Sequence, residues 1–168
     1  DYAYLLRPLD QYCRGYLEGV VEAQRNVYGG CFIGDCLSDS FIERINASYL
    51  AVTNGEFKIL REELEYAVGA EITGRERYMV LALLQNRCNV SLFSSDKEER
   101  LQNVTQPGYV DYYTQMPQVF KNSRINLNIS LKLIQSGVPL RVFDVLASGG
   151  FLMTNFQPEI VEMFVPGE

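Results

Sequence analysis

One arginine and one aspartate stand in an otherwise apolar stretch near the end of the chain. The stretch is VPLRVFDVLASGGFLMTN, residues 138–155, and the two charged residues are Arg141 and Asp144. A guanidinium can grip a phosphate through two hydrogen bonds, and a carboxylate accepts hydrogen bonds from hydroxyl groups. Three positions apart, the two side chains would share one face of a helix. Two interpretations follow: an ion pair that supports the helix, or a site that binds a diphosphate and a ribose.

The helix expected at 138–148 offers a second way to bind an anion. The free N–H groups at a helix N-terminus carry partial positive charge and need no basic patch around them. The helix is expected to begin near Pro139, and the Ser-Gly-Val sequence before it, centred on Gly137, keeps the backbone free of bulk. Arg141 falls in the first turn, where the helix dipole disfavours a cation, so a purely structural arginine is less expected there.

Small polar residues end three of the strands expected in this part of the chain. They are Ser94–Ser95, Asn128–Ser130 and Thr154–Asn155. In open parallel sheets, ligands bind beyond the carboxyl ends of the strands. Strand ends are also polar simply because loops meet water, so each residue taken alone is open to both explanations.

The chain contains no histidine. Serine-histidine and cysteine-histidine nucleophiles, and acid–base catalysis by histidine, are therefore excluded within this sequence. A catalytic base would be a carboxylate or would lie outside these residues. The four cysteines, Cys13, Cys31, Cys36 and Cys88, are expected to be free thiols, because they lack the paired spacing of a zinc site.

Composition argues against several other classes of protein. A net charge of −6 without a dense basic stretch disfavours a nucleic-acid or anionic-membrane surface. Neither G-x-G-x-x-G nor G-x-x-x-x-G-K-[ST] occurs, so hydride transfer and ATP hydrolysis lack support. The apolar runs fall far short of the roughly 20 residues that span a bilayer, and the start has no signal-peptide pattern, so we expect a cytoplasmic protein. We expect the natural chain to continue beyond both ends.

The first part of the chain, residues 1–69, is predicted to be helical and shows no chemistry. Apolar residues recur at helical spacing from Tyr4 to about Tyr28, with Pro8 in the first turn or at a kink. Ser38 or Asp39 is expected to begin a second helix, and residues 56–68 are expected to form a third.

Residues 70–168 alternate between helix and strand patterns. A capping box of Thr73 and Glu76 predicts a helix to about residue 86. Further helices are expected at 114–123, 138–148 and 158–164, with Gly149 closing the second of them. Strands are expected at 88–95, 124–130 and 151–155, and a small one at 108–113. This alternation predicts an α/β fold with a Rossmann-like parallel sheet.

These residues resemble a known family. MPQVFKNSRINLNIS and SGVPLRVFDVLASGGFLMTNFQPEIVEMF closely resemble the C-terminal part of the CgeB-like glycosyltransferases, a bacterial group related to spore maturation proteins within glycosyl transferases family 1. ITGRERYMVLALL and NVSLFSS extend the resemblance, which covers about 72–168. The resemblance implies the C-terminal half of a GT-B fold, in which two Rossmann-like domains face a cleft and this half holds a nucleotide-diphosphate sugar.

The resemblance also implies which residues bind the donor. Arg141 would contact the diphosphate and Asp144 the ribose. Tyr109 and Val110 would lie beside the base, although core packing explains them equally well, and Arg77 would lie in a phosphate-facing loop. Glu159 would serve the donor or cap its own helix. The remaining implied donor contacts are Ser130, Gly137, Pro139 and Leu140.

The chain departs from the family pattern at one position. Eight residues before Asp144 stands Ser136, where the E-x7-E pattern has an acid, so a retaining or inverting outcome stays open. The implied chemistry needs no metal, because Arg141 and the helix N-terminus would stabilise the charge on the leaving diphosphate, and no D-x-D pair is present. No cofactor is implied, because the nucleotide-diphosphate sugar is the donor substrate. The catalytic base and the acceptor, a cell-surface or spore-type glycan or protein, would involve the N-terminal domain that this sequence lacks. We therefore expect these residues alone to bind nucleotide weakly and to be inactive.

Two other functions remain open at this point. One is a non-catalytic Rossmann-like module that mediates protein contacts, in which Arg141 and Asp144 form a structural pair. The other is a GT-B-type nucleotide-sugar epimerase, which fits less well because such enzymes usually need a histidine.

Overall fold

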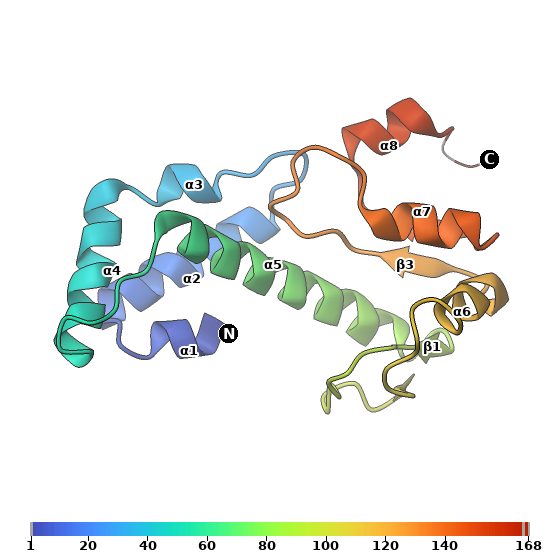
Figure 1. Ribbon diagram of the computed structural model, residues 1–168, viewed down its shortest axis with the longest axis horizontal. Helices are drawn as coiled ribbons and strands as arrows, with labels where there is room; N and C mark the ends of the chain where they lie inside the picture. Colours follow the sequence, from blue (N-terminus) through green and yellow to red (C-terminus); the bar gives the residue numbers. More distant parts are fainter. Residues whose placement is uncertain (1, 166, 168) are drawn as a thin grey trace. The chain divides into compact units, whose positions relative to one another are not determined.

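The computed structural model describes residues 2–165 and 167, and the chain divides into two compact units (Figure 1). The first unit holds the residues up to Gly74 together with Leu131–Gln135, and the second holds Arg75–Ser130 and the residues from Ser136 onward. This division and the boundary predicted at residues 69–70 both fall inside one long helix, α5 (Arg61–Leu84).

The first unit is helical, as predicted. It contains α1 (Tyr2–Leu6), α2 (Gln11–Arg25), α3 (Ile33–Cys36), α4 (Asp39–Val52) and the first part of α5. The prediction of a single helix from Tyr4 to Tyr28 is wrong, because the helix is interrupted between Leu6 and Gln11. Pro8 lies in this break and Asp10 caps the new helix, so the local sequence ends one helix and begins another. Ser38 caps α4 as predicted, accepting a hydrogen bond from the Phe41 N–H.

Apolar side chains from all five of these helices form the core of the first unit. The largest fully buried ones are Leu17, Ile33, Leu37, Ile45, Leu64 and Ile72. Gln24 is also fully buried, but its amide donates to Gly30 O (2.9 Å) and accepts from the Phe32 N–H (2.8 Å). These hydrogen bonds satisfy the buried amide and two backbone polar groups of the loop after α2, so burying Gln24 need not cost stability.

We expect the first unit to lose stability in acid through Asp10. Its carboxylate accepts from the Cys13 N–H (2.7 Å) and pairs with Arg44 (2.6 Å). These contacts, that of the Cys13 backbone first, lower the pKa of Asp10 from 3.8 to about 2. Because the folded pKa lies below the unfolded one, the stabilisation is complete above about pH 4 and is lost as the pH falls towards 2.

Urea unfolding of wild type and Asp10→Asn between pH 6 and pH 2 checks this expectation. The difference between their midpoints should be constant down to about pH 5 and should shrink towards zero at pH 2. A difference that does not change with pH would show that the Asp10 charge contributes nothing.

Helix α5 corrects the prediction of two helices, at 56–68 and from Thr73 onward. Thr73 is buried inside α5 and begins no helix: its hydroxyl donates to Gly69 O and accepts from the Lys132 N–H, both at 2.9 Å. Gly69 lies inside α5 as well. A Cβ there would lie 2.5 Å from Leu133 Cγ, so this glycine permits close packing within the unit.

The second unit contains two parallel strand pairs instead of one continuous sheet. Strand β1 (Val90–Ser91) pairs with β2 (Val104–Thr105), and β3 (Asn126–Asn128) pairs with β4 (Leu152–Thr154). The helices are α6 (Met116–Asn122), α7 (Leu140–Ala147) and α8 (Pro158–Met163), at the predicted places. Parallel pairing agrees with the prediction, but a full Rossmann-like sheet is not formed by the described residues.

The strand predicted at 108–113 is wrong. Residues 112–115 form a turn, because the Asp111 carboxylate accepts from the N–H groups of Tyr113 (3.1 Å) and Thr114 (2.8 Å) and from the Thr114 hydroxyl (2.6 Å). An aspartate that bonds to the backbone two and three positions on favours a turn over an extended chain.

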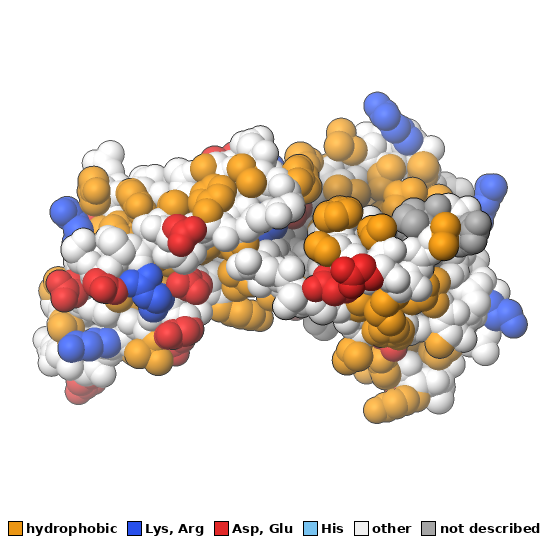
Figure 2. All heavy atoms as spheres, turned by 90° about the horizontal axis from the view of Figure 1, so that it is seen from above, with side chains coloured by type: hydrophobic (Ala, Val, Ile, Leu, Met, Phe, Trp, Pro, Cys, Tyr) orange, Lys and Arg blue, Asp and Glu red, His pale blue; other side chains and the backbone are white. Residues whose placement is uncertain are grey.

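Helix α7 contacts both β3 and β4, and its buried residues are Val142 and Val145. It ends as predicted: Gly149 has a φ of +75°, and Gly150 N donates back to Val145 O (3.0 Å). Figure 2 shows hydrophobic side chains, in orange, at the surface over α7 and α8. Within the described residues, no helix has the combination of length and apolar character that crossing a membrane requires.

Candidate functional site

The amino end of α7 presents Arg141 in its first turn. Pro139 is the N-cap residue and makes no side-chain capping bond, so no side chain of its own occupies the free N–H groups. The Arg141 guanidinium lies over the Phe120 ring, 5.4 Å from its centre, and the residue is half-buried. The side chain is therefore held against α6 and does not extend into bulk solvent.

Asp144 is held by a tyrosine from a distant part of the chain. The Tyr112 hydroxyl donates to Asp144 Oδ1 at 2.7 Å, and this hydrogen bond raises the pKa of Tyr112. No ion pair joins Arg141 to Asp144, both of which the structure describes, so the structural-pair interpretation lacks its central contact. Sequence reasoning considered Tyr109 in this segment and missed Tyr112, although a tyrosine beside a turn-forming Asp111 was a usable signal.

Arg77 brings a second guanidinium to this part of the unit. Its Nε and Nη2 donate to Ile129 O at 3.1 and 2.7 Å, just beyond the end of β3. Desolvation lowers the pKa of Arg77, and the nearby positive charge of Arg141 lowers it further. The prediction that Arg77 lies in a loop at a helix start is wrong, because it lies inside α5. The two guanidinium groups together add positive charge to this part of the unit, and positive charge favours a bound anion.

The predicted polar residues at the ends of β3 and β4 form one hydrogen-bonded group. Asn128 Nδ2 donates to Ser130 Oγ (3.1 Å) and to Thr154 Oγ1 (3.0 Å). Ser130 N donates to Asn155 Oδ1 at 3.0 Å. Ser130 itself is buried, so its first role is to join the two strand ends. The third predicted pair differs: Ser94 accepts from the nearby Asp96 N–H (3.3 Å).

Gly137 and Glu159 are brought together before α7. Gly137 has a φ of +91°, and its N–H donates to Glu159 Oε1 at 2.9 Å. Glu159 therefore does not cap its own helix, α8, as one interpretation had it, but binds the backbone that leads into α7. Its Oε2 is buried, and no described residue hydrogen-bonds to it. An unsatisfied buried carboxylate oxygen is a costly arrangement that a hydroxyl-bearing ligand would relieve.

The other predicted site residues are more loosely placed. Tyr109 and Leu140 are 72% and 77% exposed, and Val110 and Pro139 are half-buried. The high exposure of Tyr109 argues against the core-packing interpretation for that residue. Leu140 is the first residue of α7, so its backbone N–H has no intrahelical partner and could contact a ligand.

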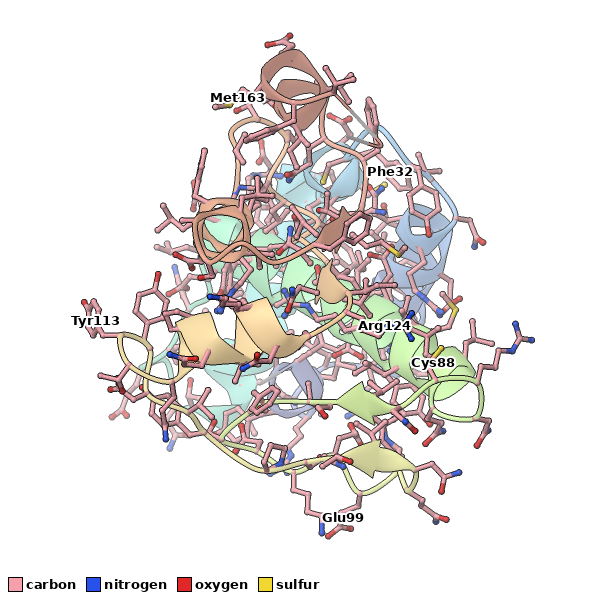
Figure 3. The ribbon with its side chains drawn as sticks, turned by 90° about the vertical axis from the view of Figure 1, so that its right-hand side faces the viewer. Phe32, Cys88, Glu99, Tyr113, Arg124 and Met163 are labelled. Carbon is pink, nitrogen blue, oxygen red and sulfur yellow. The ribbon has the colours of Figure 1, made fainter. Side chains whose placement is uncertain are left out.

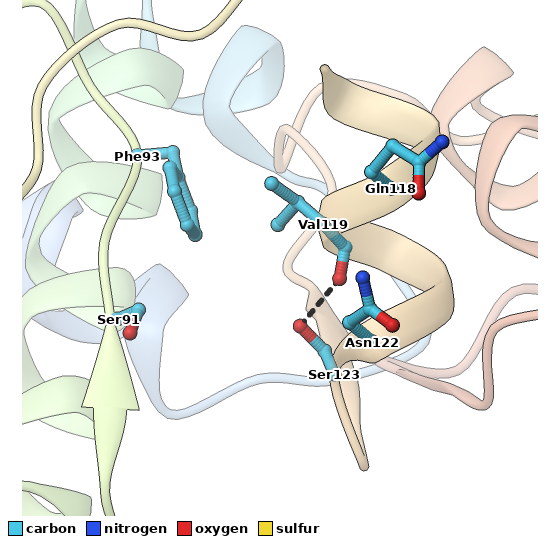
Figure 4. Close-up of a pocket in the computed structure, with 6 residues that line it drawn as sticks. All are labelled: Ser91, Phe93, Gln118, Val119, Asn122 and Ser123. Carbon is cyan, nitrogen blue, oxygen red and sulfur yellow. Dashed lines mark hydrogen bonds between the residues drawn. The ribbon is translucent and has the colours of Figure 1, made fainter.

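A separate hollow of about 310 Å³ lies between β1 and α6 (Figure 4). Its lining consists of Ser91, Phe93, Gln118, Val119, Asn122 and Ser123. None of the predicted site residues lines it, and its lining includes no charged side chain, so it lacks the groups that would bind a phosphate. The described residues also include no group of three or more histidine, cysteine, aspartate or glutamate side chains placed to hold a metal ion.

The chain matches the model of a known protein family. The model of a family described as glycosyl transferase-like matches residues 75–168, which include Arg77, Arg141, Asp144 and Glu159. No curated protein matches the chain, and no solved structure does.

Proposed function

Because the chain belongs to the glycosyl transferase-like family, we propose that its second unit binds the nucleoside diphosphate of a sugar donor whose sugar is transferred to an acceptor. The family implies a transferase with a sugar donor and an acceptor. The nucleotide form of the donor, the GT-B architecture, the CgeB-like branch and action in the cytoplasm are further parts of the proposal, and they rest on the sequence patterns described above.

The observation that carries the proposal is the order of Arg141, Asp144 and the segment that holds Tyr109 and Tyr112. Arg141 lies in the first turn of α7, Asp144 lies one turn further on, and Tyr112 reaches Asp144 from the neighbouring segment. In a nucleoside diphosphate, the phosphates, the ribose and the base follow one another in the same order. Residues three apart on a helix have Cβ atoms about 5–6 Å apart, which suits neighbouring phosphate and ribose groups. Exposed Tyr109 lies in the segment that would meet the base.

Glycosyl transfer places negative charge on the leaving nucleotide. As the bond between the sugar and the diphosphate breaks, the diphosphate oxygen gains charge, and fixed cations stabilise that charge more in the transition state than in the ground state. Arg77 and Arg141 supply such cations, and the free N–H groups at the start of α7 add to them.

Glu159 and Ser136 concern how the sugar is bound and how it is transferred. The buried Glu159 Oε2 would accept a hydroxyl of the donor, since it lies at the backbone leading into α7. Ser136 cannot act as the acid of an E-x7-E pattern, so we propose that the catalytic base comes from residues outside this sequence. The described residues supply binding and leaving-group stabilisation.

Isothermal titration of the chain with UDP, GDP, ADP, CDP and TDP tests the proposal. We expect at least one nucleoside diphosphate to bind, and to bind more tightly than its monophosphate and its nucleoside. Absence of binding by all five, or equal affinity for nucleoside and diphosphate, would contradict it. With the natural chain as enzyme, transfer of the sugar distinguishes a transferase from an epimerase, which would return an altered donor.

A further inference from the structure

We propose that Tyr112 is a positioning residue for ribose recognition, which fixes the Asp144 carboxylate so that it binds the 2′- and 3′-hydroxyls of a ribonucleotide. The inference rests on the nucleotide-binding function proposed above and adds a determinant of selectivity between ribonucleotides and deoxyribonucleotides. It starts from the 2.7 Å hydrogen bond between the Tyr112 hydroxyl and Asp144 Oδ1.

The turn that carries Tyr112 is rigidly built. Besides the three hydrogen bonds that its carboxylate accepts, Asp111 donates one from its N–H to Gln115 Oε1 (2.7 Å). The Asp111 carbonyl accepts from the N–H groups of Gln115 (3.1 Å) and Met116 (2.9 Å), which joins the turn to the start of α6. Tyr112 is therefore presented to α7 from a fixed backbone, and the contact to Asp144 is preorganised.

Asp144 keeps capacity for a ligand after this contact is made. An ionised carboxylate can accept about four hydrogen bonds. Tyr112 uses one of these on Oδ1, and no residue in the described ranges donates to Oδ2. The side chain is half-buried, so the second oxygen can still be reached from solvent. A carboxylate with one oxygen anchored and the other open suits a vicinal diol.

The anchor matters for selectivity because a free aspartate side chain has several orientations. Without the phenol, Asp144 would give up rotational freedom each time it bound two hydroxyls. A 2′-deoxyribose offers only one of the two hydroxyls and so gains less from a correctly oriented carboxylate. Loss of the anchor should therefore weaken binding of the ribonucleotide more than that of its deoxy counterpart.

Tyr112→Phe tests the inference, because it removes the hydroxyl and keeps the ring. The dissociation constants of the nucleoside diphosphate that binds wild type most tightly and of its 2′-deoxy form are measured by titration calorimetry. We expect wild type to prefer the ribose form by about 10-fold, the value of one good hydrogen bond to a charged group, and the variant by about 3-fold or less. In an Asp144→Asn background, the same change should have no further effect on the ratio.

Tyr113→Phe is the matched control. Tyr113 is the next residue, packs edge-on against Tyr112 with ring centres 5.2 Å apart, and is 85% exposed. Figure 3 shows it projecting away from the ribbon. Its variant should keep the wild-type ratio.

Each outcome decides the inference. A Tyr112→Phe variant with the wild-type ratio, or one that loses both ligands equally, would overturn the positioning role and leave the proposed function standing. Wild type that binds a nucleoside diphosphate without preferring ribose would do the same. Failure of wild type to bind any nucleoside diphosphate would overturn the proposed function and the inference with it.

Discussion

Replacing Arg141 by alanine is expected to weaken nucleoside diphosphate binding by about 10- to 100-fold, since a charge-assisted contact between guanidinium and phosphate contributes about 1.5–3 kcal/mol. Arg141 makes no ion pair among the described residues, and its contact with the Phe120 ring leaves its N–H groups available to a ligand. Because the variant also loses the contact with the Phe120 ring, its urea unfolding should be measured beside its affinity. Titration calorimetry of the variant measures the loss directly.

Two further variants make this result specific. Arg124→Ala removes the same charge from an exposed position in the same unit and should change affinity less than about 2-fold once salt is present. Arg141→Lys keeps the charge but cannot form two parallel hydrogen bonds to a phosphate, so its affinity should lie between those of wild type and Arg141→Ala. Equal binding by wild type and Arg141→Ala would remove Arg141 from the site.

Gly150→Ala is expected to destabilise the second unit by about 3 kcal/mol, at the upper end of the cost of overpacking. A Cβ at Gly150 would lie 2.7 Å from Phe120 O and 2.7 Å from Asn126 Nδ2. Asn126 Nδ2 donates to that same carbonyl at 3.0 Å, so the added methyl group would clash with both partners of a buried hydrogen bond. A methyl group cannot replace that hydrogen bond. Backbone at Phe120 cannot move aside without disturbing the end of α6. Urea unfolding followed by circular dichroism measures the loss.

Gly74→Ala provides the opposite expectation from the same substitution. Gly74 lies inside α5, and nothing lies within 4 Å of the position that its Cβ would take. Alanine should stabilise the helix there by about 0.5–1 kcal/mol. If both variants destabilised the chain to a similar degree, the packing argument for Gly150 would be wrong.

Local patterns predicted the parts of the fold that local contacts determine. The Ser38 cap bonds to an N–H three residues away, and the Gly149 turn depends on its own backbone, so both could be read from neighbouring residues. The same reasoning failed at Thr73, where the capping-box pattern was present but no cap formed. The hydroxyl of Thr73 bonds to Lys132, 59 positions away, and a local pattern contains no information about that contact.

The candidate site shows the same division between local and distant contacts. The placement of Arg141 and Asp144 on one helix followed from their spacing. Their partners did not, because Tyr112 lies 32 positions from Asp144 and Ile129 lies 52 positions from Arg77. The incorrect strand prediction at 108–113 is one reason why Tyr112 was missed. In a strand, successive side chains point to opposite faces, whereas a turn directs them differently. The Asp111 side chain, which creates that turn, was the local signal available.

The most direct test of the central claim is a nuclear magnetic resonance titration of the chain's amide groups with the nucleoside diphosphate that it binds. The claim predicts the largest shifts at Gly137, Leu140, Arg141 and Val142, around the start of α7, with a smaller change at the Tyr112 turn. Shifts confined to Phe93 and Asn122, in the hollow between β1 and α6, with α7 unchanged, would place the ligand elsewhere and contradict it.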